Sequence, residues 1–104
     1  MIEKGSIDDY IKYRLEKSKQ SLKDAILLYE NSSWNASVNR LYYSLFYALI
    51  ALLLKNGIDA KSHAGVRRMF GNEFVNTSKI DAKYGKLFSK LFDWRERGDY
   101  GDLF

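Results

Sequence analysis

The stretch "LYYSLFYALIALLL", from Leu41 to Leu54, is the longest hydrophobic run in the chain. Its 14 residues fall short of the roughly 20 that a membrane-spanning helix needs, so they predict a buried helix. The predicted helix extends from Trp34 to Asn56 and is apolar nearly all round. Such a helix is typical of the centre of a bundle or of a subunit contact. Asn56 and Gly57 then supply a stop signal, so the other helices are expected to surround this one.

The first helix is predicted to begin at Ser6, a good N-cap residue, with Asp8 and Asp9 in its first turn. Its apolar residues recur at steps of three and four, as they do on one face of a helix. They are Ile7, Tyr10, Ile11, Leu15, Leu22, Ala25, Ile26 and Tyr29. Lysines interleaved with acidic residues point elsewhere, which is typical of a solvated face. Ser33 offers an N-cap for the central helix.

Two shorter helices are predicted after the central one. Ser62 can cap a helix from His63 to about Val75, and a last helix runs from about Asp81 to Gly98. Their inward faces are Val66, Met69, Phe70 and Phe74 in the first and Leu87, Phe88, Leu91 and Phe92 in the second. Nothing in the sequence reads as a strand, a repeat or a linker. The chain therefore predicts an all-α fold, an antiparallel four-helix up-down bundle in one domain over residues 1–104.

Composition narrows the classes of function. The chain of 104 residues has no cysteine, so disulfides and thiolate chemistry are absent, and its single histidine argues against a zinc site. We expect neither a metal nor a cofactor. The N-terminal stretch lacks the apolar core of a signal peptide, so we expect a cytoplasmic protein that does not bind a membrane. The net charge of +4 allows contact with phosphates without requiring it.

Polar residues within the apolar helices mark a candidate site. Arg40, Tyr43, Ser44 and Tyr47 are spaced to gather in one stripe of the central helix. In the last helix, at about 100° per residue, Arg95 falls near the centre of the apolar arc and should point inward. Arginine can hold two phosphate oxygens and tyrosine can stack on a base, so the predicted ligand-binding residues are Arg40, Tyr43, Tyr47, Arg95, Asp99 and Tyr100. Structural roles remain open, because Arg95 can pair with Asp99 and tyrosine hydroxyls often join buried helices.

Three ordered motifs resemble one family. "ASVNRLYYSLFYA" (36–48), "SHAGVRRMF" (62–70) and "RERGDYGD" (95–102) resemble the HEPN superfamily, most of all its small stand-alone prokaryotic branch. The resemblance implies an all-α bundle, usually a homodimer with a cleft at or near the subunit contact. It also implies a minimal nucleotidyltransferase as partner, in a toxin–antitoxin or substrate-binding pair. Independently, a homodimer is expected because the central helix has more apolar surface than three neighbouring helices cover.

The same resemblance raises the question of catalysis. Nucleases of this family cut RNA without a metal, using an arginine and a histidine roughly four to six residues later. Arg95 matches the arginine, but Asp99, Tyr100 and Gly101 occupy the positions where the histidine would fall. A base for the 2′-hydroxyl normally needs a pKa near 7, which favours histidine. The only histidine, His63, can serve only if the fold or a second subunit brings it to Arg95.

Two functional interpretations follow, and a third remains. The leading one is a nucleotide- or RNA-binding partner of a minimal nucleotidyltransferase that lacks strong catalysis of its own. The alternative is a metal-independent ribonuclease toxin built on Arg95 with His63 or Tyr100. A purely structural helical dimerisation module is the third.

Overall fold

A computed structural model of the chain describes residues 4–97. Its elements are α1 (Lys4–Glu30), α2 (Trp34–Lys55), α3 (His63–Phe70), a π-helical turn η1 (Gly71–Val75) and α4 (Ala82–Arg97). Over this range every regular element is helical and no strand is present, which confirms the all-α prediction with four helices.

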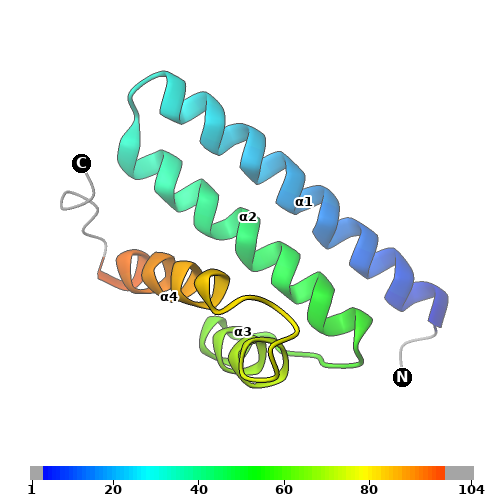
Figure 1. Ribbon diagram of the computed structural model, residues 1–104. Coiled ribbons are helices and arrows are strands. Elements are labelled where there is room, and N and C mark those ends of the chain that lie inside the picture. The colour runs from blue at the N-terminus through cyan, green and yellow to red at the C-terminus, as the bar shows by residue number, and fades with distance from the viewer. Residues whose placement is uncertain (1–3, 98–104) are drawn as a thin grey trace.

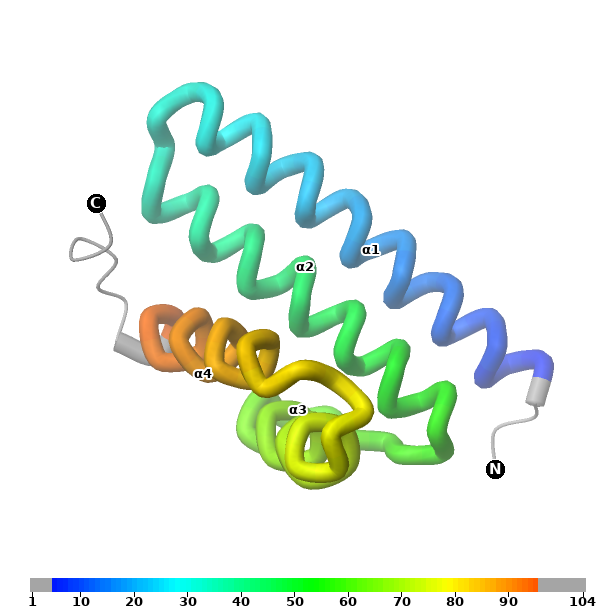
Figure 2. Tube along the Cα trace, viewed as in Figure 1, coloured from blue at the N-terminus to red at the C-terminus, as the bar shows by residue number. Residues whose placement is uncertain are grey.

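The helices are arranged on two sides of α2. Figure 1 shows α1 and α2 as a long antiparallel hairpin, with α3 and α4 packed on the side of α2 that faces away from α1. The chain trace in Figure 2 shows the same arrangement, with α1 on one side of α2 and both α3 and α4 on the other. The central position predicted for the 34–56 helix is therefore confirmed.

One side of α2 carries the hydrophobic core. Tyr42 is completely buried, and its ring lies parallel to that of Phe88, with centroids 5.7 Å apart. The other fully buried large side chains also come from α2, α3 and α4; they are Leu53, Val66 and Leu91. The predicted inward face of the last helix was wrong in one residue, since Leu87 is 44% exposed. At about 100° per residue Leu87 lies a quarter turn from Phe88, beyond the stripe of α4 that α2 and α3 cover.

The other side of α2 packs against α1 through serines. Ser18 Oγ donates to the Ser44 carbonyl at 2.7 Å, and Ser44 Oγ donates to the Ser18 carbonyl at 2.9 Å. Ser37 Oγ donates to the Ala25 carbonyl at 2.7 Å. These small side chains let the two backbones approach closely. Ser44 therefore faces α1 and does not join the stripe of Arg40, Tyr43 and Tyr47 as the spacing had suggested.

The narrow contact with α2 leaves much of α1 uncovered. Several of the residues predicted to form its buried face are exposed: Tyr10, Leu15, Leu22, Ile26 and Tyr29. The reason is that α1 packs mainly against one helix, and one neighbour covers only a narrow stripe that here includes Ser21 and Ala25. Periodicity locates an apolar face but does not say how much of it another element will cover.

The predicted helix ends are mostly confirmed. Ser62 Oγ accepts a hydrogen bond from the Gly65 backbone N–H at 2.9 Å, which is the expected cap of α3. Gly57 has φ +77°, the left-handed conformation that ends α2, and the Ile58 N–H donates to the Leu53 carbonyl. The last helix begins at Ala82, with the Asp81 carboxylate accepting from the Lys83 N–H.

Two other predicted ends need correction. The first helix begins at Lys4, so Asp8 and Asp9 lie after its first turn. Ser33 occupies the N-cap position of α2, but its side chain makes no capping hydrogen bond. Its backbone carbonyl instead accepts from the Ser37 N–H at 2.9 Å.

The hydropathy of α2 fits its central position. By length and composition alone, Trp34–Lys55 is apolar enough to cross a membrane, and half of its apolar window is buried inside the protein. One such helix is weak evidence for a membrane span, and the core packing accounts for its composition.

Candidate functional site: an arginine–tyrosine–histidine cluster

His63 meets the middle of α2. The 58–62 loop brings the first residue of α3 back to Tyr42, so that His63 Nδ1 and the Tyr42 hydroxyl are 2.7 Å apart. The imidazole ring also stacks on Phe46, with centroids 4.2 Å apart and planes 17° apart. His63 is half-buried, in the first turn of a helix as its sequence position suggested. The aromatic stack and the hydrogen bond together hold the ring in one orientation.

Arg95 reaches the same tyrosines from α4. Its guanidinium carbon lies 5.5 Å from the Tyr42 ring centroid and 5.9 Å from that of Tyr43. Its Nε donates a long hydrogen bond of 3.4 Å to the Tyr43 hydroxyl. Arg95 therefore points inward, as predicted. Because the His63 ring also lies 5.9 Å from that of Tyr43, the fold brings His63 and Arg95 to one pair of tyrosines.

The predicted residues of α2 join this cluster. The Arg40 guanidinium carbon lies 5.0 Å from the Tyr43 centroid, and its Nη2 and Nε donate to Asn39 Oδ1 at 2.8 and 3.2 Å. The Tyr43 and Tyr47 rings are 5.9 Å apart. Four predicted residues, Arg40, Tyr43, Tyr47 and Arg95, are therefore connected through Tyr43. Asp99 and Tyr100, also predicted, lie outside the described residues.

Sequence reasoning missed two members of the arrangement. Tyr42 was not singled out as a candidate, yet it contacts both His63 and Arg95. Arg14 of α1 was not considered, although its guanidinium carbon lies 5.6 Å from the Tyr47 ring centroid. The signal for Arg14 was its spacing, because Tyr10 precedes it by four residues and Lys17 follows by three, on one flank of the helix.

The charge of the cluster suits an anion. Among the side chains of residues 5–95 the ion pairs are Lys61 with Asp59 and Arg67 with Asp93, so neither Arg14 nor Arg40 has a carboxylate within ion-pair distance there. Guanidinium groups beside tyrosine rings can hold phosphate oxygens while the rings stack on bases. In the same range no group of three or more His, Asp or Glu side chains could hold a metal ion.

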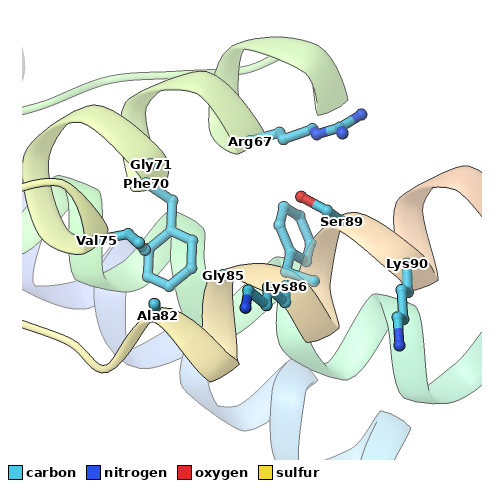
Figure 3. Close-up of a pocket in the computed structure, with 10 residues that line it drawn as sticks. Arg67, Phe70, Gly71, Val75, Ala82, Gly85, Lys86, Ser89 and Lys90 are labelled. Carbon is cyan, nitrogen blue, oxygen red and sulfur yellow. The ribbon is translucent and has the colours of Figure 1, made fainter.

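A hollow lies elsewhere on the molecule, away from the arginine–tyrosine–histidine cluster. It has a volume of about 460 Å³, between α3 and α4, with Phe70 and Val75 among its apolar lining residues (Figure 3). Arg67 stands at its rim but is paired with Asp93 at 3.3 Å, and Lys90 points away from Arg67 in Figure 3. This hollow contains none of the residues that the sequence singled out as ligand-binding, and its arginine is already neutralised.

The fold and the cluster define the class of protein. An all-helical chain with four helices, built on a long hairpin, matches the all-α bundle that the three sequence motifs implied. The HEPN domain model matches residues 11–104, and the chain belongs to the HEPN domain family.

Named relatives support the same placement. A "UPF0332 protein" of Thermotoga maritima is 42% identical over 93 residues, which is 89% of this chain and 70% of that protein. "Putative toxin MJ0142" of Methanocaldococcus jannaschii is 36% identical over 83% of this chain and 58% of its own length. "Putative toxin MJ0605" of the same organism is 37% identical over 90% of this chain and 70% of its own length. No solved structure gave a significant match.

Proposed function

We propose that this HEPN protein is the nucleotide- or RNA-binding subunit of a toxin–antitoxin-type pair whose partner is a minimal nucleotidyltransferase. The observation that carries the proposal is the presence of two guanidinium groups beside the Tyr43 ring, with the carbon of Arg40 at 5.0 Å and that of Arg95 at 5.9 Å from its centroid. Two relatives bear the name of toxins, which supports the pairing. The proposed location is the cytoplasm, where both RNA and such a partner are present.

The geometry around Tyr43 favours a nucleotide over a simple anion. Two arginines beside one ring supply positive charge for phosphate oxygens, and the tyrosines of the cluster supply aromatic surface and a hydroxyl for the nucleoside part. Arg40 is held by the neutral amide of Asn39, which leaves its positive charge uncompensated by any carboxylate in the described range. A phosphate can take that place without displacing an ion pair.

Nucleotide binding is tested by titrating purified protein with labelled RNA and with mononucleotides. Arg95→Gln and Arg40→Gln should each weaken binding about tenfold, because each removes a charge-assisted contact to phosphate. Arg68→Gln is the matched control, since Arg68 is exposed on α3 and none of the contacts described above involves it. Equal affinity in all three variants would refute the proposal.

The partner is tested by co-expression. A minimal nucleotidyltransferase from the same genome should co-purify with the tagged chain in a fixed ratio and should suppress any toxicity of the chain alone. A genome without such a gene, or a candidate that never co-purifies, would remove this half of the proposal while leaving nucleotide binding to stand.

We also propose a homodimer, through the exposed apolar flank of α1 formed by Leu15, Leu22 and Ile26. At about 100° per residue this flank lies on the opposite side of the α1–α2 contact from Tyr10. Isolated exposed leucines are ordinary, but a continuous flank on a long helix is typical of a subunit contact. Light scattering should show a dimer that Leu22→Glu dissociates. Leu27→Glu, on the outer face of α1, is the control, and a monomeric wild type contradicts the dimer.

A second function is favoured by one specific observation. Tyr42 contacts both His63 and Arg95, so the only histidine lies beside the arginine although it is 32 positions away in the sequence. In a metal-independent ribonuclease His63 would take the proton of a 2′-hydroxyl. The 2′-oxygen then attacks the neighbouring phosphorus, and the bond to the 5′-oxygen breaks. The leaving 5′-oxygen takes a proton from water or from the protonated imidazole, giving a cyclic phosphate and a 5′-hydroxyl. Arg95 would hold the phosphate oxygens as negative charge develops.

Cleavage is measured with purified protein and RNA in EDTA. If the chain is a ribonuclease, Arg95→Ala and His63→Asn should both lose cleavage by more than about a hundredfold, while Arg68→Ala retains it. Cleavage that survives His63→Asn but not Arg95→Ala would point to a different base, with Tyr100 the remaining candidate. No cleavage by any form, with RNA binding intact, leaves the binding subunit as the function.

A further inference from the structure

The cluster continues along α2 toward α1. From Tyr43 the next ring is Tyr47, with centroids 5.9 Å apart, and the Arg14 guanidinium carbon lies 5.6 Å from the Tyr47 centroid. Arginines and tyrosines therefore follow one another from α4 across α2 to α1. We call this series, made of Arg95, Tyr43, Tyr47 and Arg14, the arginine–tyrosine strip.

Arg14 has an unusual environment for a cation. Besides Tyr47, its guanidinium carbon lies 5.0 Å from the Tyr10 centroid and 5.7 Å from that of Tyr13, so three tyrosine rings surround it. Its Nη2 donates to the Tyr10 hydroxyl at 2.8 Å. Its Nε is buried and has no hydrogen-bond partner within the described residues. The rings stabilise the cation, but the unsatisfied buried donor is costly, so this guanidinium lacks the full set of hydrogen bonds that an anion can supply.

A pocket of about 320 Å³ lies beside Arg14. It is formed between α1 and α2, with apolar walls that include Ile7, Ile50 and Leu54. Asp59 and Lys61 also line it. Lys61 Nζ lies 3.9 Å from Asp59 Oδ2, so the acidic side chain of this lining is already paired with a cation. The volume is near the lower limit of about 300 Å³ for small-ligand pockets, enough for one flat ring. The far end of the strip thus offers both a cation and an apolar recess.

We propose that a single-stranded RNA segment binds along the arginine–tyrosine strip, with one phosphate at Arg95 and a later one at Arg14. The inference rests on the proposed function, because it assumes that the Tyr43 cluster binds a nucleotide. It adds that the ligand is a strand of several nucleotides, whose far end is held by Arg14 and whose last base enters the pocket.

The combination of a cation at each end of the strip with two rings between them is what favours a nucleic acid strand. Guanidinium groups follow a phosphate backbone while tyrosines stack on bases, whatever the sequence. Tyr10 and Tyr13, beside Arg14, are 45% and 49% exposed, so a ligand at Arg14 can contact the exposed part of both side chains. An acidic protein segment would use the arginines but has no need of the rings. A mononucleotide at Tyr43 would leave Arg14 and its pocket unused.

The test compares a long ligand with a short one on the intact protein. The probes are a fluorescent uridine octanucleotide, measured by anisotropy, and uridine monophosphate, measured by calorimetry. Arg14→Gln should weaken octanucleotide binding about tenfold at low salt and reduce the salt dependence by about one phosphate contact, a change of about 0.7 in slope. It should leave binding of the monophosphate unchanged, because that ligand occupies only the Arg95 end.

Controls separate this inference from the proposed function. Arg68→Gln makes the same change of charge outside the strip, and thermal melting of each variant checks that it is folded. Tyr13→Ala provides a second variant on an exposed ring, and it should weaken the octanucleotide several-fold without affecting the monophosphate.

The contrary outcomes are distinct. If Arg14→Gln and Arg68→Gln behave alike while Arg95→Gln weakens both ligands, the strip is wrong and the proposed function stands. If Arg95→Gln affects neither ligand, the proposed function is wrong. Competition by an acidic peptide as strong as that by RNA of the same charge, with Tyr13→Ala unaffected, would assign Arg14 to a protein partner and overturn the RNA strand.

Discussion

The two sides of α2 are held in different ways. Toward α3 and α4, aromatic rings fill the space, with Tyr42 lying parallel to both Phe88 and Phe46. Toward α1, the contact is made by serines whose hydroxyls donate to backbone carbonyls of the facing helix. One side gains stability from buried area, and the other from close approach and directed hydrogen bonds.

This difference explains the sequence of α2. An apolar run suggests a helix buried equally on all sides, but its polar members divide the surface. Ser37 and Ser44 mark the side that meets α1, and Tyr43 and Tyr47 mark the edge between the two sides. The ligand-binding candidates lie at that edge, where rings are half-buried and arginines from three helices can reach them.

The largest loss of stability is expected on the side of α2 that packs against α3 and α4. Phe88 is 1% exposed and lies against both Tyr42 and Phe70, so Phe88→Ala should lower the free energy of unfolding by about 3–5 kcal/mol. Denaturant unfolding followed by circular dichroism measures this. A loss below about 1 kcal/mol would mean that the ring stack is not the main source of stability.

On the side of α2 that meets α1, stability should depend more on the size of the substituted side chain than on its polarity. Ser44→Leu should destabilise the protein by about 1–3 kcal/mol, because the added bulk forces α1 away from α2. Ser44→Ala removes one hydrogen bond and should cost about 1 kcal/mol. The same unfolding experiment separates them, and a Leu variant more stable than the Ala variant would show that close approach is unnecessary.

A smaller loss of stability is expected at Tyr42, where the hydrophobic core meets the arginine–tyrosine–histidine cluster. Tyr42→Phe keeps the ring and removes the hydroxyl that lies 2.7 Å from His63 Nδ1, so stability should fall by about 1 kcal/mol. Nitrogen NMR of the imidazole should show a changed balance of the two ring tautomers, because one nitrogen loses a partner. An unchanged imidazole spectrum would argue that the hydroxyl does not orient the ring.

The smallest effect is expected on the outer face of α1. Leu27 is 61% exposed, and Leu27→Ser should change stability by less than about 0.5 kcal/mol, as surface substitutions usually do. Comparison with Phe88→Ala in the same denaturant series tests the claim that α1 lies outside the main core. A loss of 2 kcal/mol or more, roughly that of a core leucine, would place Leu27 in a contact not present within one chain.

Local signals predicted most of the fold because helix formation is local. Ser62 and Gly57 mark helix ends through hydrogen bonds and backbone conformations within a few residues. The predictions for Leu87 and Leu22 were wrong for a different reason. Their exposure depends on how many helices pack against their own helix, which periodicity does not report.

By itself the sequence determined the four helices, the central position of the 34–55 helix and the inward direction of Arg95, since each depends on residues within one or two turns. Only the tertiary structure decided that His63 meets Arg95 at Tyr42 and that Arg14 of α1 lies over Tyr47. The residues in these contacts are separated by 21 or more positions along the chain. Their contacts depend on the direction in which each helix packs, which no local pattern specifies.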